Sequence, residues 1–286
     1  MRKILVLTSL ISIVDHNALG KTTDAGIKVW KRNSGDFSGI ENPAMKVHPL
    51  TIELDSLEIR TLEDPHTKKM VTVRGISLSK VFVGHAVSTT SDTALLHFEN
   101  SMIIPIPMNG SDAFLAFSLK ADGAWSSDFP EVSRPDDRFK DPLPLKFSGN
   151  KVIPLKTSEG FNPWRYANSL VGIEFVYAQA YFAQFPAGKT PQAKAGREVF
   201  EKRCQYCHGV RQVGARYGWD FAGPLPAFEK RTPRSLYFHV KIPKLNQFER
   251  GTRMPTQTDL EKTEAENIWA WLKEAAEPAS VKPYRP

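Results

Sequence analysis

Short apolar segments dominate the first two thirds of the chain. They are rich in β-branched and aromatic side chains and are bounded by polar residues, a pattern that predicts strands. The predicted strands are 47–59, where apolar positions alternate only roughly, and 71–73, 94–98, 103–106, 113–119 and 170–177. Two stretches, 55–59 and 78–83, are long enough for a turn or two of helix. The N-terminal part is therefore predicted to be mostly β.

The periodicity becomes helical after Phe185. Residues 186–191, Pro-Ala-Gly-Lys-Thr-Pro, form a predicted linker, and 192–202 then carry apolar residues at helical spacing. A last helix is predicted to begin at Thr258 as its N-cap, because Glu261 three positions on would complete a capping box. The C-terminal part is therefore predicted to be helical.

The first 20 residues have the features of a signal peptide. A basic start, Met1-Arg2-Lys3, precedes an apolar run at 4–14, and the small residues Ala18 and Gly20 stand where a signal peptidase cleaves. A buried first strand is the alternative, but a strand needs neither the basic start nor the small-residue exit. Cleavage after Gly20 and a periplasmic location are predicted. The run is shorter than the about 20 residues that cross a bilayer, so no transmembrane anchor is expected.

These boundaries leave two domains after the leader. The predicted fold class is α+β, with a mostly β N-terminal domain at 21–185, a linker at 186–191 and an all-α C-terminal domain at 192–286. Hydrophobic residues make up 41% and charged residues 24% of the 286 positions, which is ordinary globular usage. Coiled-coil, collagen-like and largely disordered chains are therefore excluded.

The mature chain would carry its net positive charge in the last third. Residues 191–286 contain 17 Lys and Arg against 11 Asp and Glu, whereas 21–190 contain 19 of each kind. A basic face of this kind attracts a redox protein with an acidic docking face, with Lys241, Lys244 and Arg250 as candidate contacts. A solvated face without a partner is the simpler alternative. Nucleic acid is disfavoured as a partner because the chain is expected to be exported.

The two cysteines of the chain lie three positions apart, in Cys204-Gln205-Tyr206-Cys207-His208. Two thiols at this spacing can both reach the vinyl groups of one porphyrin edge, and the histidine that follows is placed to bind the iron. Zinc would need two further ligands at regular spacing, and a thioredoxin-like pair would follow a strand in an α/β domain, so neither alternative fits. One covalent haem c is predicted, and a disulfide scaffold is excluded.

The motif leaves the second axial ligand of the iron open between His239 and Met254. His239 lies in an apolar segment with helical character, where a histidine is more often a core or surface residue. Met254 offers a soft, neutral thioether, which favours ferrous iron and raises the reduction potential, as suits a carrier that accepts electrons.

Residues 195–274 resemble class I c-type cytochromes. The resemblance rests on Gly196 and Phe200 in the first helix, the attachment motif, Gly223-Pro224-Leu225, Met254-Pro255 before the last helix and Trp271-Leu272 within it. It implies that His208 and Met254 are the axial ligands and that the Pro224 carbonyl accepts a hydrogen bond from the His208 ring. Phe200, Trp269 and Trp271 are expected to pack between the first and last helices against the haem edge.

A looser resemblance covers about 45–180. The segments 50–57, 73–78 and 81–82 resemble the sulfite-oxidase-type molybdopterin-binding domain, in which strands similar to 94–98 and 102–106 follow. Enzymes of that kind usually supply a cysteine thiolate to molybdenum, but both cysteines here belong to the haem motif. Molybdopterin is therefore not expected, and we interpret the domain as a docking module.

Histidine and methionine side chains are scattered over this domain without regular spacing. A copper or second haem site built from His85, His97 and Met102 is the alternative to ordinary core and surface roles. Trp125, Trp164 and Tyr166 are candidates for a groove, although burial in a β core explains them equally well.

Together these features predict a periplasmic monohaem cytochrome c that transfers single electrons between a dehydrogenase or other oxidoreductase and the respiratory chain. With both axial positions filled, the iron has no open site for substrate, so no catalytic residue is assigned. The alternative is a haem-containing subunit or self-contained oxidoreductase whose N-terminal domain binds substrate or a second cofactor. A third hypothesis, ligand sensing or peroxidase chemistry, requires Met254 to leave the iron.

Overall fold

The computed structural model describes residues 22–31, 47–85, 91–109, 113–132, 145–156, 161–223, 229, 231–241 and 254–276. The predicted signal peptide lies outside these residues. Within them, none of the helices has the length and apolar character needed to cross a membrane.

The N-terminal part consists mostly of strands. They are β1 (Thr22–Lys31), β2 (His48–Glu53), β3 (Glu58–Glu63), β4 (Met70–Ser77), β5 (Thr93–Phe98), β6 (Ile103–Pro107), β7 (Ala113–Ala121), β8 (Ala124–Ser126), β9 (Lys151–Pro154) and β10 (Leu170–Val176). Two short helices, α1 (Leu78–His85) and α2 (Ala178–Phe182), and two 3-10 turns, Leu54–Ser56 and Pro163–Arg165, interrupt them. The predicted β character of this part is confirmed.

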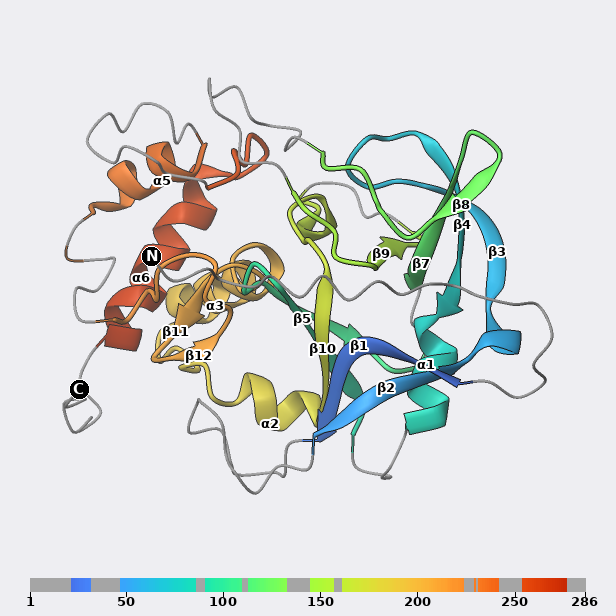
Figure 1. Ribbon diagram of the computed structural model, residues 1–286. Coiled ribbons are helices and arrows are strands. Elements are labelled where there is room, and N and C mark those ends of the chain that lie inside the picture. The colour runs from blue at the N-terminus through green and yellow to red at the C-terminus, as the bar shows by residue number, and fades with distance from the viewer. Residues whose placement is uncertain are drawn as a thin grey trace, which may run out of the picture.

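The strands form two sheets of five strands each (Figure 1). The first has the order β2-β1-β10-β5-β6, in which β1 and β10 run parallel and the other neighbours antiparallel. The second has the order β3-β4-β7-β8, and β9 pairs with the start of β7. A single apolar cluster contains residues from both sheets, among them Leu96 of β5, Ile173 of β10 and Leu115 of β7. The two sheets therefore share one core.

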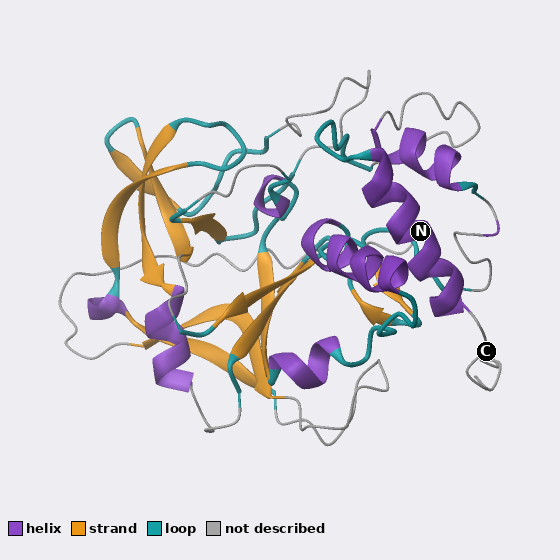
Figure 2. Cartoon of the chain, turned by 180° about the vertical axis from the view of Figure 1, so that it is seen from behind, coloured by secondary structure: helices purple, strands orange, loops and turns teal. Residues whose placement is uncertain are grey.

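The C-terminal part contains the helices α3 (Pro191–Arg203), α5 (Pro233–Lys241) and α6 (Lys262–Ala276), and a small hairpin of β11 (Gly209–Val210) and β12 (Val213–Gly214). Figure 2 shows these helices gathered beside the sheets. Alternation along β5 and β10 sends Leu95 and Val176 to the face opposite the shared core, where they join an apolar cluster with Phe200 and Trp271. The first sheet therefore packs directly against the C-terminal part.

The segment between the two parts is held at both ends. Phe185 is buried, the indole N–H of Trp271 donates to the Pro186 carbonyl (2.7 Å), and the Thr190 hydroxyl accepts from Ala193 N–H (3.1 Å), which caps α3. The side chain of Glu274 in α6 also accepts from the Thr190 hydroxyl (2.9 Å).

Three local predictions differ from the structure. The predicted helix at 55–59 is wrong beyond the turn Leu54–Ser56, because Glu58–Glu63 pairs with β4 as a strand. The last helix begins at Lys262 rather than after Thr258. The Glu264 side chain accepts a hydrogen bond from Glu261 N–H (2.9 Å). The side-chain-to-backbone bond of a capping box therefore forms three residues later than predicted. The C-terminal part is not purely helical, because β11 and β12 pair within it.

Candidate haem-binding site

The attachment motif lies at the end of α3. Cys204 is the C-cap, and its N–H donates to the Phe200 carbonyl (2.8 Å). The chain then turns so that Cys207 N–H and His208 N–H both donate to the Cys204 carbonyl (3.1 and 2.9 Å). Neither cysteine forms a disulfide, and each is 6% exposed. Burial raises the pKa of the Cys204 thiol to about 12, so this group is a neutral thiol at neutral pH.

A close crossing of α3 and α6 fixes the position of the motif. A side chain at Gly196 would overlap with the backbone of Asn267 in α6, so only glycine allows this approach. One turn further on, the rings of Phe200 and Trp271 lie 4.8 Å apart. The predicted packing of these two aromatic residues between the helices is confirmed, whereas Trp269 donates its indole N–H to the Arg231 carbonyl near the start of α5 (2.7 Å).

The residues 218–221 surround the ring of His208. The Nδ1 atom lies 2.8 Å from the Trp219 carbonyl oxygen, and the Phe221 ring stacks on the imidazole at 4.3 Å with an angle of 22°. A side chain at Gly218 would overlap with the ring. Because a carbonyl can only accept, Nδ1 carries the proton and the Nε2 lone pair is left for a metal.

Electrostatics favours the same form of His208. Burial lowers the pKa of the imidazole, and the hydrogen bond to Trp219 and the charge of Asp220 offset this only in part. The ring is therefore neutral at neutral pH, which is the form that binds iron.

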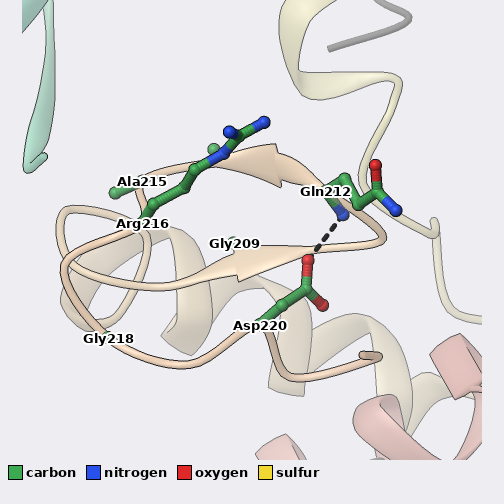
Figure 3. A pocket seen from close by; sticks show the side chains of 7 residues that line it. Gly209, Gln212, Ala215, Arg216, Gly218 and Asp220 are labelled. Carbon is green, nitrogen blue, oxygen red and sulfur yellow. Dashed lines mark hydrogen bonds between the residues drawn. The ribbon is translucent and has the colours of Figure 1, made fainter. Parts of the chain in front are cut away.

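Asp220 holds the hairpin that follows the motif. Its carboxylate accepts from the backbone N–H of Arg211 (3.0 Å), Gln212 (2.5 Å) and Ala222 (2.8 Å). Arg211 and Gln212 form the hairpin turn with positive φ angles of 54° and 67°, which non-glycine residues adopt only when held there. Figure 3 shows this carboxylate directed at the Gln212 backbone, beside a surface hollow of about 320 Å³.

Met254 and His239 are the two candidates for the second axial ligand of the iron. Met254 is half-buried against the apolar cluster that also contains Cys204 and Phe221. His239 lies on α5 and is also half-buried. Pro224 lies outside the described residues, so its predicted hydrogen bond to His208 stays a prediction. The described acceptor for the ring is the Trp219 carbonyl.

These residues fit a covalently bound haem. Two buried thiols stand on one turn, a neutral imidazole offers Nε2, and a methionine packs against the same apolar cluster as the first cysteine. Sequence reasoning missed Gly218 and Trp219, because one contributes only the absence of a side chain and the other a backbone carbonyl.

The candidate docking residues are only partly described. Lys241 is half-buried, with Nζ 3.4 Å from the Leu260 carbonyl oxygen and 5.1 Å from the centre of the Tyr237 ring. Lys244 and Arg250 lie outside the described residues.

The candidate residues of the β part whose side chains the structure describes lie in separate surroundings. His97 donates its Nε2–H to the Glu174 carboxylate (2.8 Å), Met102 is fully buried in the shared core, and the side chain of His85 lies outside the described residues. Across the described part of the chain, no cluster of three or more His, Cys, Asp or Glu side chains is arranged to hold a metal ion. Trp164 and Tyr166 belong to one segment. Trp125 lies on the strand β8, and the guanidinium group of Arg74 lies over its ring.

The β part also contains a buried ion pair that has no signal in the sequence. Lys151 Nζ lies 2.6 Å from Asp64 Oδ2 and 4.3 Å above the Phe147 ring, and both charged side chains are buried. His66 Nδ1 lies 3.2 Å from Asp64 Oδ1. The pair borders a hollow of about 230 Å³ that is otherwise mostly apolar.

Comparison with known proteins adds an independent finding. Residues 191–272 match the family model described as cytochrome C oxidase, cbb3-type, subunit III. No curated protein matches the chain, and no solved structure matches it. The C-terminal part is therefore a c-type cytochrome domain, which implies haem c and a role in electron transfer. The sulfite-oxidase-like resemblance of 45–180 has no support in these comparisons.

Proposed function

We propose that this protein is an exported monohaem cytochrome c, which transfers single electrons between an oxidoreductase partner and the respiratory chain in the periplasm. The observation that carries the proposal is the fixed tautomer of His208. The Trp219 carbonyl oxygen lies 2.8 Å from Nδ1 of His208, on the same turn as two buried cysteines that form no disulfide.

Each residue has a defined task in this proposal. Cys204 and Cys207 would hold the haem through two thioether bonds, and His208 Nε2 and Met254 Sδ would bind the iron. When bound, the haem supplies a one-electron couple. The hydrogen bond to Trp219 makes the imidazole a stronger electron donor. The Phe221 ring stacked on His208 keeps water from that face.

The N-terminal part acts in this proposal as a docking module rather than as a catalytic domain. We retain for it the sulfite-oxidase-like fold without the cysteine ligand, and the boundaries 21–185, 186–191 and 192–286. The partner would be a redox protein with an acidic face, attracted by the basic C-terminal part and contacted by Lys241, Lys244 and Arg250. Charge reversal at these three positions should reduce both the rate and the salt dependence of reduction by the native donor.

The decisive experiment starts from the mature protein purified from its native host. A mass equal to the chain from Lys21 plus one haem, a c-type pyridine haemochrome spectrum and one iron per chain are expected. The oxidised protein should also show the weak near-infrared band of a thioether bound to iron. A chain without covalent haem would contradict the proposal, and stoichiometric molybdenum or copper would favour an oxidoreductase with a second redox centre instead.

Two methionine variants test the axial ligand. Met254→Leu should abolish the near-infrared band and lower the reduction potential, because the soft thioether no longer stabilises ferrous iron. Met70→Leu is the matched control: Met70 is 65% exposed at the start of β4 and should leave both properties unchanged. A band that persists in Met254→Leu would assign the ligand to another residue, with His239 as the first candidate.

A further inference from the structure

One edge of the haem-binding segment is covered by the β part. The Ile103 N–H donates to the Tyr206 carbonyl (3.1 Å), and the Arg216 N–H donates to the Ser101 carbonyl (3.0 Å). Tyr206 stands between the two cysteines in the sequence, and the centre of its ring lies 6.1 Å from that of Phe161. Cys207 itself belongs to the core shared by the two sheets. A partner protein therefore cannot reach the cysteine side without displacing these residues.

Trp219 lies where a partner protein can reach the haem-binding segment from another side. Its side chain is 69% exposed, against 45% for Tyr177 and 41% for Phe238, the other markedly exposed aromatic residues in the described part of the chain. Keeping a large indole in water costs hydrophobic free energy, and tryptophan is among the residues that dominate binding energy at protein interfaces. The exposed indole of Trp219 is therefore available to a partner protein as a contact.

The backbone of Trp219 connects this surface to the iron ligand. Its carbonyl accepts the Nδ1–H of His208 at 2.8 Å, and Phe221 and Gly218 hold the ring in place. Electronic coupling decays more slowly through covalent and hydrogen bonds than through gaps. The route from the solvent to the iron ligand at this point is thus one residue and one hydrogen bond long.

We infer that Trp219 is the surface contact through which the redox partner exchanges electrons with the haem. This inference rests on the proposed function and adds the place of electron exchange to it. A single electron passes between the partner and the iron, and no bond is made or broken. The basic residues of the C-terminal part then attract the acidic face of the partner, and Trp219 is the contact that lies next to the iron ligand.

The surroundings of Trp219 specify the chemistry of the partner. Arg216 and Gln212 are exposed on the wall of the adjacent hollow (Figure 3). The one carboxylate there, Asp220, already accepts three backbone N–H groups. A partner with an apolar patch for the indole and carboxylates at its rim fits this surface.

The test compares two electron donors in stopped-flow experiments on the haem-loaded protein. Reduced flavodoxin, an acidic flavoprotein, is the protein probe, and ascorbate is the small probe that needs no docking surface. The quantity measured is the ratio of the two second-order rate constants, and the reduction potential of each variant is measured beside it, so that an effect on the haem itself is detected. Trp219→Ala should lower this ratio about tenfold, since loss of an interface tryptophan commonly costs more than 1 kcal/mol.

Two further variants complete the design. Trp219→Phe keeps an aromatic contact and the backbone carbonyl and should keep the ratio within about twofold of the wild type. Phe238→Ala removes the exposed aromatic residue of α5 and should leave the ratio unchanged. An unchanged ratio in Trp219→Ala, or a fall in Phe238→Ala instead, would overturn the inference.

The outcomes also separate this inference from the proposed function. A wild-type protein that carries no haem, or that neither donor reduces, would end the proposed function. A wild-type protein that both donors reduce, with Trp219→Ala indistinguishable from it, would end only the assignment of Trp219. If ascorbate and flavodoxin slow equally in Trp219→Ala, the residue acts by positioning His208 and not as a contact.

Discussion

The two parts of the molecule place their buried polar groups in different ways. In the C-terminal part, the cysteines, His208 and the residues that hold its ring all lie between positions 204 and 221. In the N-terminal part, the ion pair joins Asp64 and Lys151, which are 87 positions apart. The first arrangement is set by local spacing and the second by the topology of a sheet, so only the first can be recognised in a sequence.

The ion pair joins two elements that are not neighbours in the sheet. Asp64 follows β3, and Lys151 is the first residue of β9. The strands β4 and β7 lie between them in the sheet. Both side chains are buried, so each charge depends on the other for its stability.

The largest expected effect comes from removing one member of this pair. Lys151→Met should lower the free energy of unfolding by about 3–5 kcal/mol, because it leaves the Asp64 carboxylate buried without its cation. Urea unfolding followed by circular dichroism measures this. The matched control is Lys146→Met, five positions earlier, where the lysine is exposed and pairs with Glu131 at 3.3 Å; this change should stay within about 0.5 kcal/mol.

The double variant Asp64→Leu/Lys151→Met sharpens the argument. Since two apolar side chains leave no unpaired buried charge, most of the stability lost in Lys151→Met should return. A loss of less than 1 kcal/mol in Lys151→Met would show that water reaches Asp64, and the contrast between the two parts would then fail.

The strands and helices were predicted from the sequence where burial follows a simple period. The strands β4 to β7 and β10, and the helices α1, α3 and α6, all fall on predicted segments. The strand β1 was missed because the residues before it were interpreted as a leader, and its parallel partner β10 is nearly 150 positions away. A two-residue pairing such as β11 with β12 has no periodicity to detect.

The candidate site shows the same limit. The motif Cys204 to His208 can be recognised because covalent attachment requires fixed spacing between side chains. Gly218 and Trp219 cannot, because their roles depend on an absent side chain and on a backbone carbonyl. The ion pair of Asp64 and Lys151 is invisible for a third reason, since scattered acids and lysines in a β domain are usually exposed.

The next largest effect on stability is expected from a glycine in the C-terminal part, Gly196, compared with a glycine in the N-terminal part, Gly84. Gly196→Ala should cost about 1–3 kcal/mol, because the new methyl group would overlap with the Asn267 backbone and push α3 away from α6. Gly84→Ala in α1 meets open space and should instead raise stability by up to about 1 kcal/mol, through the better helix propensity of alanine.

Thermal unfolding of the two glycine variants measures the difference. The haem spectrum of Gly196→Ala provides a second readout, since α3 positions the attachment motif. Equal stability of the two variants would mean that the crossing of α3 and α6 can relax without cost, and that it does not fix the motif.

The pH dependence of stability should identify Asp64 directly. Burial alone would raise the pKa of this carboxyl, but the hydrogen bond from His66 and the charge and hydrogen bond of Lys151 bring it well below its ordinary value of 3.8. The unfolded chain therefore binds the proton more readily than the folded one, and stability is lost as the pH falls below about 3.8. Asp64→Asn lacks this loss, so the gap between the melting temperatures of wild type and variant should stay constant from pH 6 to about pH 4 and shrink between there and pH 2.5. A constant gap across this range would contradict the assignment.

The smallest expected effect comes from an exposed ion pair in the C-terminal part, which serves as the contrast to the buried pair of Lys151 and Asp64. Lys262 and Glu266 lie one helical turn apart on α6, with 3.6 Å between Nζ and Oε1 and side chains 69% and 39% exposed. Lys262→Met removes an exposed pair worth about 0.3–0.5 kcal/mol, but it also removes a positive charge from the first residue of the helix, where the helix dipole disfavours cations. The two terms oppose each other, so the free energy of unfolding should change by less than about 0.5 kcal/mol, measured in the same urea experiment as Lys151→Met. The same substitution then has a small effect in one part and a large effect in the other, and a loss above 1 kcal/mol at Lys262 would show that burial does not govern the difference.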